Sequence, residues 1–226
     1  MKNILILFLL LISICFYSQT KTFIRDYTYN AGEADSKLTS RTLALQEVKT
    51  SLLEEIGTYL QSEFENKIEQ NNINGELTFT QLTKSKIITL AAGITRIKII
   101  EEKWTGEAYY IKSEIIVDNN DLKRKLFDLI KDKAKTKELE DLQEKNKEAN
   151  EEIARLKKEF LIIKNNGNLE IEKNQIKELF NQKINTLDAI EFFEKAYSYF
   201  QANEYQNSID YYFKSLQMIF FKNILL

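Results

Sequence analysis

The sequence predicts a helix-dominated α+β protein. A small domain, with an antiparallel sheet under one long helix, precedes a long helix or coiled coil and then a C-terminal helical hairpin. Two observations favour this class. Between residues 19 and 120, β-rich and amphipathic segments follow each other in the order strand, helix, helix, strand, strand. The 226 residues include no proline and only six glycines, which favours long helices in the remainder of the chain.

The first 18 residues have the features of a secretory signal peptide. Lys2 precedes an unbroken apolar run from Ile4 to Ile12, and Ser18 stands before a polar flank. The run is shorter than the roughly 20 apolar residues of a membrane span, so we expect cleavage after Ser18, with an anchoring helix as one alternative. Lipidation of Cys15 is another. Membrane association therefore depends on an uncleaved signal or a lipidated Cys15, and the predicted location is the periplasm or outer cell envelope.

The first elements of the small domain follow from residue types and spacing. Lys21 to Asn30 is rich in aromatic and β-branched residues and predicts a strand. From Ala34 to about Gln70, apolar residues recur every three or four positions, which predicts a long helix with one core face. These residues are Leu45, Val48, Leu52, Ile56, Tyr59 and Leu60. Gly57 within this helix predicts a close crossing with the sheet.

The rest of the domain is predicted to be a second helix and a hairpin. Thr78 with Gln81 resembles a capping box that opens a helix through Ala92. Two β-rich runs then flank Thr105 and Gly106, which predicts a β-hairpin. Along its second run, residues at period two form one face that we expect to pack on the long helix. They are Tyr109, Ile111, Ile115 and Val117.

Two runs of this domain carry a family resemblance, "EADSKLTSRTLALQEVKTSLLEEIGTYLQS" and "TLAAGITRIKIIEEKWTGEAYYIKSEIIVD". Residues 23–121 resemble the N-terminal module of a group of exported bacterial proteins. They are distantly similar to small surface lipoproteins and to flagellar outer-membrane assembly proteins. The resemblance implies a non-enzymatic envelope role, in agreement with the signal peptide, and it brings no catalytic residue with it.

Residues 121–164 predict a coiled coil or a long spacer helix. Their composition shifts to Lys, Glu and Leu, and apolar residues follow a 3-4-3-4 spacing typical of an a/d seam. The seam is Leu139, Leu142, Asn146, Ala149, Ile153, Leu156, Phe160 and Ile163. In a parallel homodimer, Asn146 would fix the register and Glu152 would face Lys157 of the other helix. The spacing equally fits one amphipathic helix docked on its own chain, so both arrangements stay open.

The region 169–226 is predicted to be helical and to contain a repeat. The run "KNNGN" from Lys164 predicts an interdomain break. Another helix follows, marked by Ile176, Leu179, Phe180, Ile184 and Leu187. Residues 190–218 resemble a tetratricopeptide repeat, with Asn203 where glycine usually turns the chain. The matching packing residues are Phe192, Ala196, Tyr199, Tyr205, Ser208, Ile209, Tyr212 and Leu216. A generic amphipathic helical hairpin is the alternative.

Composition argues against several classes of function. Histidine is absent and Cys15 lies in the predicted signal peptide, which removes the commonest general base, thiolate nucleophile and transition-metal ligands. No block of basic residues predicts a nucleic-acid surface. Adjacent carboxylates such as Glu54 and Glu55 point in different directions on a helix. We therefore predict no catalytic, cofactor-binding or metal site.

The sequence thus predicts an exported, non-enzymatic envelope protein that binds another protein through its C-terminal repeat, with the coiled coil as a spacer. A second hypothesis makes the N-terminal module a ligand-binding or catalytic domain for envelope material, and it requires convergent carboxylates in a polar pocket beneath the Trp104 hairpin. A third is an incomplete copy of a longer repeat protein, because no later helix covers the last apolar residues. These are Ile219, Phe220, Phe221, Ile224, Leu225 and Leu226.

Overall fold

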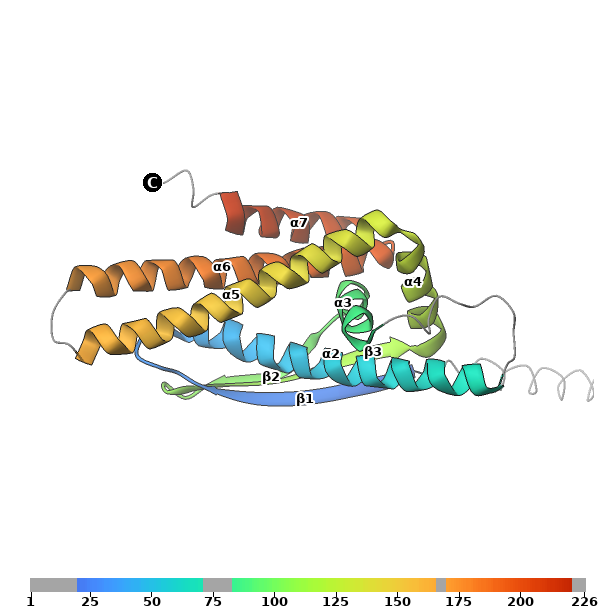
Figure 1. Cartoon of the computed structure of the whole chain (residues 1–226), viewed down its shortest axis with the longest axis horizontal. Helices are drawn as coiled ribbons and strands as arrows, with labels where there is room; N and C mark the ends of the chain where they lie inside the picture. The colour runs from blue at the N-terminus through green and yellow to red at the C-terminus, as the bar shows by residue number, and fades with distance from the viewer. Residues whose placement is uncertain (1–19, 71–82, 166–169, 221–226) are drawn as a thin grey trace, which may run out of the picture.

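A computed structural model describes residues 20–70, 83–165 and 170–220 of the chain. The predicted signal peptide, the Thr78–Gln81 capping box and residues 221–226 lie outside these ranges. Within them the chain forms six helices and one small antiparallel sheet, as the predicted helix-dominated α+β class requires (Figure 1). None of the helices in these ranges is both long and apolar enough to cross a membrane.

The sheet has three antiparallel strands in the order β1 (Thr20–Asn30), β3 (Ala108–Asp118), β2 (Lys98–Trp104). The predicted hairpin joins β2 to β3, and Gly106 in its turn has φ 102°, a conformation that favours glycine. On the central strand, the four residues predicted to face the core are all buried. They are Tyr109, Ile111, Ile115 and Val117, and α2 (Lys37–Gln70) packs on β3 and β1.

Helix α2 starts one residue after Ser36, whose Oγ accepts a hydrogen bond from Thr39 N at 3.2 Å and so caps the first turn. Helix α3 (Lys84–Ile94) starts after Thr83, whose Oγ1 accepts from Lys86 N at 3.2 Å. The prediction for Gly57 was wrong about its neighbour. A Cβ at Gly57 would lie 2.6 Å from Cγ1 of Ile88, so the close crossing is between α2 and α3.

The second half of the chain folds back over α2 and α3. Helix α4 (Asn119–Lys131) is capped by Asp118, and α5 (Lys133–Asn165) follows after a break at Asp132. Helix α6 (Glu170–Gln201) runs beside α5, and α7 (Tyr205–Phe220) lies on α6 (Figure 1). The sequence predicted two successive helices where α6 is one, because no residue between Leu187 and Ile190 breaks the helical pattern.

The hydrophobic core continues from the sheet into these later helices. Leu122, Leu126 and Leu129 of α4, Leu139 of α5 and Tyr197 of α6 belong to the same buried cluster as the side chains between sheet and α2. A second cluster joins α5 and α6 to Leu43 of α2. The core therefore crosses residue 120, where the predicted small domain ends.

Candidate functional site

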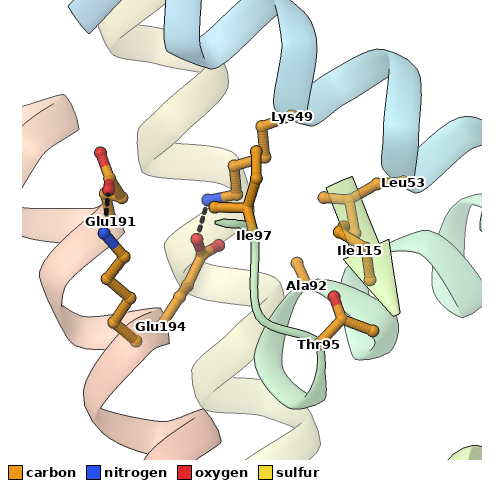
Figure 2. A pocket seen from close by; sticks show the side chains of 9 residues that line it. Lys49, Leu53, Ala92, Thr95, Ile97, Ile115, Glu191 and Glu194 are labelled. Carbon is orange, nitrogen blue, oxygen red and sulfur yellow. Dashed lines mark hydrogen bonds and ion pairs between the residues drawn. The ribbon is translucent and has the colours of Figure 1, made fainter. Parts of the chain in front are cut away.

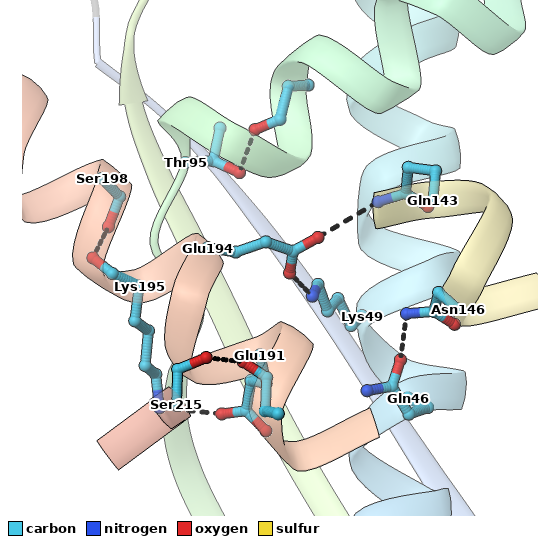
Figure 3. Close-up of polar contacts among 12 residues, drawn as sticks. Gln46, Lys49, Thr95, Gln143, Asn146, Glu191, Glu194, Lys195, Ser198 and Ser215 are labelled. Carbon is cyan, nitrogen blue, oxygen red and sulfur yellow. Dashed lines mark hydrogen bonds and ion pairs between the residues drawn. The ribbon is translucent and has the colours of Figure 1, made fainter. Parts of the chain in front are cut away.

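A buried polar cluster lies where α2, α5 and α6 meet (Figures 2 and 3). Lys49 Nζ forms an ion pair with Glu194 Oε2, and Gln143 Nε2 donates a hydrogen bond to Glu194 Oε1 at 3.1 Å. Lys49 is four residues after Leu45 and three before Leu52, so its spacing puts it on the core face of α2. Glu194 lies seven residues after Leu187 and shares the core face of α6. This pair was not predicted from the sequence, although charged residues at core spacing were a usable signal.

The space beside this pair is too small for a substrate. The cavity lined by Lys49, Glu194, Thr95 and Ile115 has a volume of about 20 Å³, which suits a single water molecule. Burial lowers the pKa of Lys49 to about 8, and Glu191 opposes that shift. The ammonium therefore stays charged at neutral pH beside its carboxylate. This arrangement connects three helices rather than exposing a reactive amine.

A second polar cluster connects the start of α2 to α5. Asp35 Oδ2 accepts hydrogen bonds from Tyr29 Oη and Gly32 N, both at 2.8 Å, and it pairs with Lys157 Nζ at 3.3 Å. Lys157 also contacts the Tyr29 hydroxyl. Burial lowers the pKa of Lys157 to about 8 and raises the pKa of Asp35. The dimer register predicted Lys157 opposite Glu152 of another chain, whereas here Lys157 is paired within its own chain.

The whole predicted coiled-coil seam is used within one chain. Leu139 and Leu142 pack with the sheet core, and Asn146 Nδ2 donates to Gln46 Oε1 of α2 at 3.4 Å. The remaining seam residues pack in the second cluster with α6. They are Ala149, Ile153, Leu156, Phe160 and Ile163. The structure thus shows the docked amphipathic helix, and in this arrangement the seam has no apolar side chains left for a second copy.

The region of the predicted repeat forms a hairpin of α6 and α7. Asn203, in the turn, has φ 60°, which is consistent with its predicted place at a glycine-like position. Ala196 and Ser208 are buried and let the two helices approach closely. Aromatic rings fill the space beside them: Tyr199 stacks on Tyr211 with centroids 5.4 Å apart, and Phe193 meets Tyr212 edge-on at 5.3 Å. Phe192 also contacts the Tyr211 ring at 6.0 Å.

Three of the predicted packing residues instead lie on the outer side of α7. Tyr205, Ile209 and Leu216 are exposed, and Phe213, which was not among the predicted packing residues, is exposed beside them. Their spacings of four, four and three residues put all four side chains on one helix face, which we call the outer stripe. Each is between 46% and 61% exposed. Phe200 of α6 extends the stripe, with its ring 5.8 Å from that of Tyr205.

The hairpin of β2 and β3 does not show the convergent carboxylates that a site beneath Trp104 would need. The Trp104 ring packs 5.9 Å from Tyr109. Glu102 Oε2 accepts hydrogen bonds from Arg41 Nε at 2.8 Å and from Tyr109 Oη at 3.1 Å, so that carboxylate is engaged. Across the described ranges, no group of three or more acidic or other ligand side chains is placed to hold a metal ion.

No family model, curated protein or solved structure matches the chain.

Proposed function

We propose that this is an exported, non-enzymatic envelope protein that binds an amphipathic helix of another protein on the outer stripe of α7. The observation that carries the proposal is the exposure of Tyr205, Ile209, Phe213 and Leu216 on one helix face. A contiguous exposed apolar patch on a folded protein is typical of an interaction site. Anchors at three- and four-residue spacing suit a helix that presents the same spacing in return.

The packing of α7 supports this proposal. Its inner face is fixed to α6 by aromatic contacts and by Ser215 Oγ, which donates to the Ala189 carbonyl at 2.8 Å (Figure 3). The outer stripe is therefore held in place before a partner arrives, which reduces the entropy lost on binding. Polar residues Gln206, Asp210 and Gln217 follow one side of the stripe. An apolar centre with a polar rim is the usual anatomy of a protein interface.

Two further parts of the proposal come from the sequence. The pattern of residues 1–18 supports export, and the spacing of residues 190–218 supports a tetratricopeptide-like hairpin whose outer face receives the partner. Residues 121–164 are predicted from the sequence to be a spacer. In this proposal α5 instead helps to hold the hairpin in place, because it packs against α6.

Photo-crosslinking in the native envelope tests the binding surface. A photoreactive phenylalanine analogue at Phe213 should crosslink to one protein, at residues spaced three or four apart on the apolar face of a helix. Ile209→Asp should abolish the crosslink, because a charge in the centre of an apolar interface must be desolvated without a partner. Asp210→Asn, beside the stripe, should leave it intact.

The same experiment can reject the proposal. Crosslinks spread over unrelated proteins, or confined to an extended segment of the partner, would contradict a helix bound on α7. Ile209 is 47% exposed, so Ile209→Asp should leave the thermal midpoint nearly unchanged, and circular dichroism of each variant checks this.

A further inference from the structure

Strand β1 is an edge strand of the sheet formed by the described residues. It bonds to β3 on one side, and no other strand within residues 20–70, 83–165 and 170–220 pairs with its other side. Ala31 N donates to Glu107 O at 2.8 Å, which continues the register that pairs Asn30 with Ala108. Hydrogen-bonded pairs alternate along an antiparallel ladder. Odd positions of β1 therefore bond to β3, and even positions direct their N–H and C=O groups outward.

The centre of this free edge is formed by Thr22, Ile24, Asp26 and Thr28, all exposed. The Ile24 carbonyl accepts a hydrogen bond from the Arg25 guanidinium at 2.9 Å, as expected for a carbonyl that faces away from β3. An exposed, regular edge of eleven residues is a template for another strand. The charged residues of β1 restrict which strand can pair with this edge and in which register.

An open groove of about 580 Å³ lies beside this strand on the side of α2. Lys21, Phe23 and Arg25 of β1 line one wall, and α2 lines most of the other, with Lys84 of α3 at its end. The α2 residues are Ser51, Glu54, Glu55, Thr58, Tyr59 and Ser62. A strand added to β1 would direct every second side chain into this groove. Glu55 already pairs with Arg25 across the groove at 2.9 Å, and Glu54 beside it suits a further basic side chain.

We propose that the occupant of this edge is β1 of a second copy of the chain, antiparallel, with Ile24 of each copy directly opposite the other. The result is a continuous six-stranded sheet across a two-fold axis. In this pairing, the outward-facing, even-numbered residues of one β1 must lie opposite even-numbered residues of the other. The three registers with the longest overlap then put the two-fold axis at Ile24, Arg25 or Asp26. Centring on Arg25 or Asp26 puts like charges directly opposite each other, which is destabilising.

The register centred on Ile24 is complementary along the strand. Ile24 meets Ile24 on the open face of the sheet, and Thr22 lies opposite Asp26 of the second copy. On the face toward α2, Phe23 lies opposite Arg25, and Lys21 lies opposite Tyr27, which gives cation–aromatic pairs. In this chain Lys21 Nζ already lies over the Tyr59 ring, 3.6 Å from its centroid, so this basic residue is accommodated beside aromatic groups.

The position of α2 allows this pairing. Because α2 packs on both β1 and β3, the two α2 helices of a dimer would lie about two strand spacings apart, which is about 10 Å. Packed helices have axes roughly 8–10 Å apart. The side of α2 that would face its counterpart carries Glu54, Glu55 and Tyr59 as well as Ser51, Thr58 and Ser62, and the small side chains of the last three permit that approach.

Disulfide trapping tests the register in the full-length chain with Cys15→Ser. Ile24→Cys should give a disulfide-linked dimer on mild oxidation, because Cα atoms of a hydrogen-bonded antiparallel pair are about 5.5 Å apart, within the disulfide range. Thr28→Cys is the matched control on the same edge. In this register the two copies of residue 28 are eight positions apart along the sheet, about 27 Å, and no disulfide should form.

Charge substitutions test the pairing without a crosslink. Ile24→Lys puts two ammonium groups opposite each other and should eliminate the dimer in sedimentation analysis. Thr22→Lys, an equally exposed change, faces Asp26 of the second copy and should retain it. Both should keep the parent circular dichroism. A monomeric parent protein, a disulfide at Thr28→Cys as efficient as at Ile24→Cys, or an Ile24→Cys disulfide to a different protein would each overturn the proposal.

Discussion

Lys49 shows how a charged side chain is held inside a helical core. Its ammonium is buried against Glu194, and Gln143 supplies the other donor to that carboxylate. Two charges taken out of water lose hydration that their mutual attraction only partly replaces. Such a pair therefore adds little to the free energy of unfolding, but loss of either member leaves the other as an uncompensated buried charge.

Substitution of Lys49 should show this dependence. Lys49→Met should lower the free energy of unfolding by about 3–5 kcal/mol, because Glu194 then keeps its buried charge without a cation. The double variant Lys49→Met/Glu194→Leu should recover most of the loss, because apolar side chains of similar volume fill the space. Urea unfolding of the four proteins measures the coupling, and simple additivity of the two single changes would contradict it.

Asp188 predicts a pH dependence of stability with a definite sign. Burial raises its pKa from 3.8 to about 6, while the Thr42 hydroxyl, which donates to Oδ1 at 3.0 Å, opposes the shift. The folded chain thus holds this proton more tightly than the unfolded chain does. The stabilisation is complete below pH 3.8 and is lost as the pH rises through about 6.

Asp188→Asn should therefore stabilise the protein at pH 7, by about 3 kcal/mol, since one pKa unit corresponds to about 1.4 kcal/mol. The amide keeps an oxygen for Thr42 and removes the buried charge. At pH 4 the advantage should largely disappear, because Asp188 is then protonated in the folded state. Urea unfolding at both pH values measures this, and an equal advantage at both would count against the assignment.

At the scale of elements, the sequence predicted local structure better than contacts between distant elements. The β2–β3 hairpin and the core face of α2 were predictable because period-two and 3-4 patterns depend only on nearby residues. The helix against which the α5 seam packs was not predictable, because a 3-4 spacing is the same whether the seam packs on a second copy or on α6. The Lys49–Glu194 pair and the outer stripe were missed for the same reason: both depend on which helices meet.

Gly57 is a case in which an element contact reverses a local preference. Alanine should favour α2 by about 1 kcal/mol over glycine. Here its Cβ would lie 2.6 Å from Ile88 Cγ1, so we expect Gly57→Ala to destabilise the protein by about 1 kcal/mol after partial adjustment of α3. In an Ile88→Ala background the same change should become stabilising, because the obstructing atoms are gone. Thermal unfolding of the parent, the two single variants and the double variant measures this change of sign.

At the scale of the whole molecule, we expect the two buried clusters to determine how the chain unfolds. The first joins the sheet to α4, α5 and α6, and the second joins α5 and α6 to α2 through Leu43. Both include residues from before and after residue 120. A chain built in this way should lose its sheet and its later helices together, even though composition and resemblance divide it there.

Trp104, the only tryptophan, makes this cooperativity measurable because it reports on the sheet, whereas far-UV circular dichroism reports mainly on the helices. The two urea transitions should coincide. Leu156→Ala removes a buried side chain of the second cluster and should cost about 2–5 kcal/mol. Since Leu156 belongs to the cluster that does not include Trp104, an equal shift of both midpoints requires the clusters to unfold as one unit. A shift in circular dichroism alone would show that the sheet domain holds its fold without the later helices.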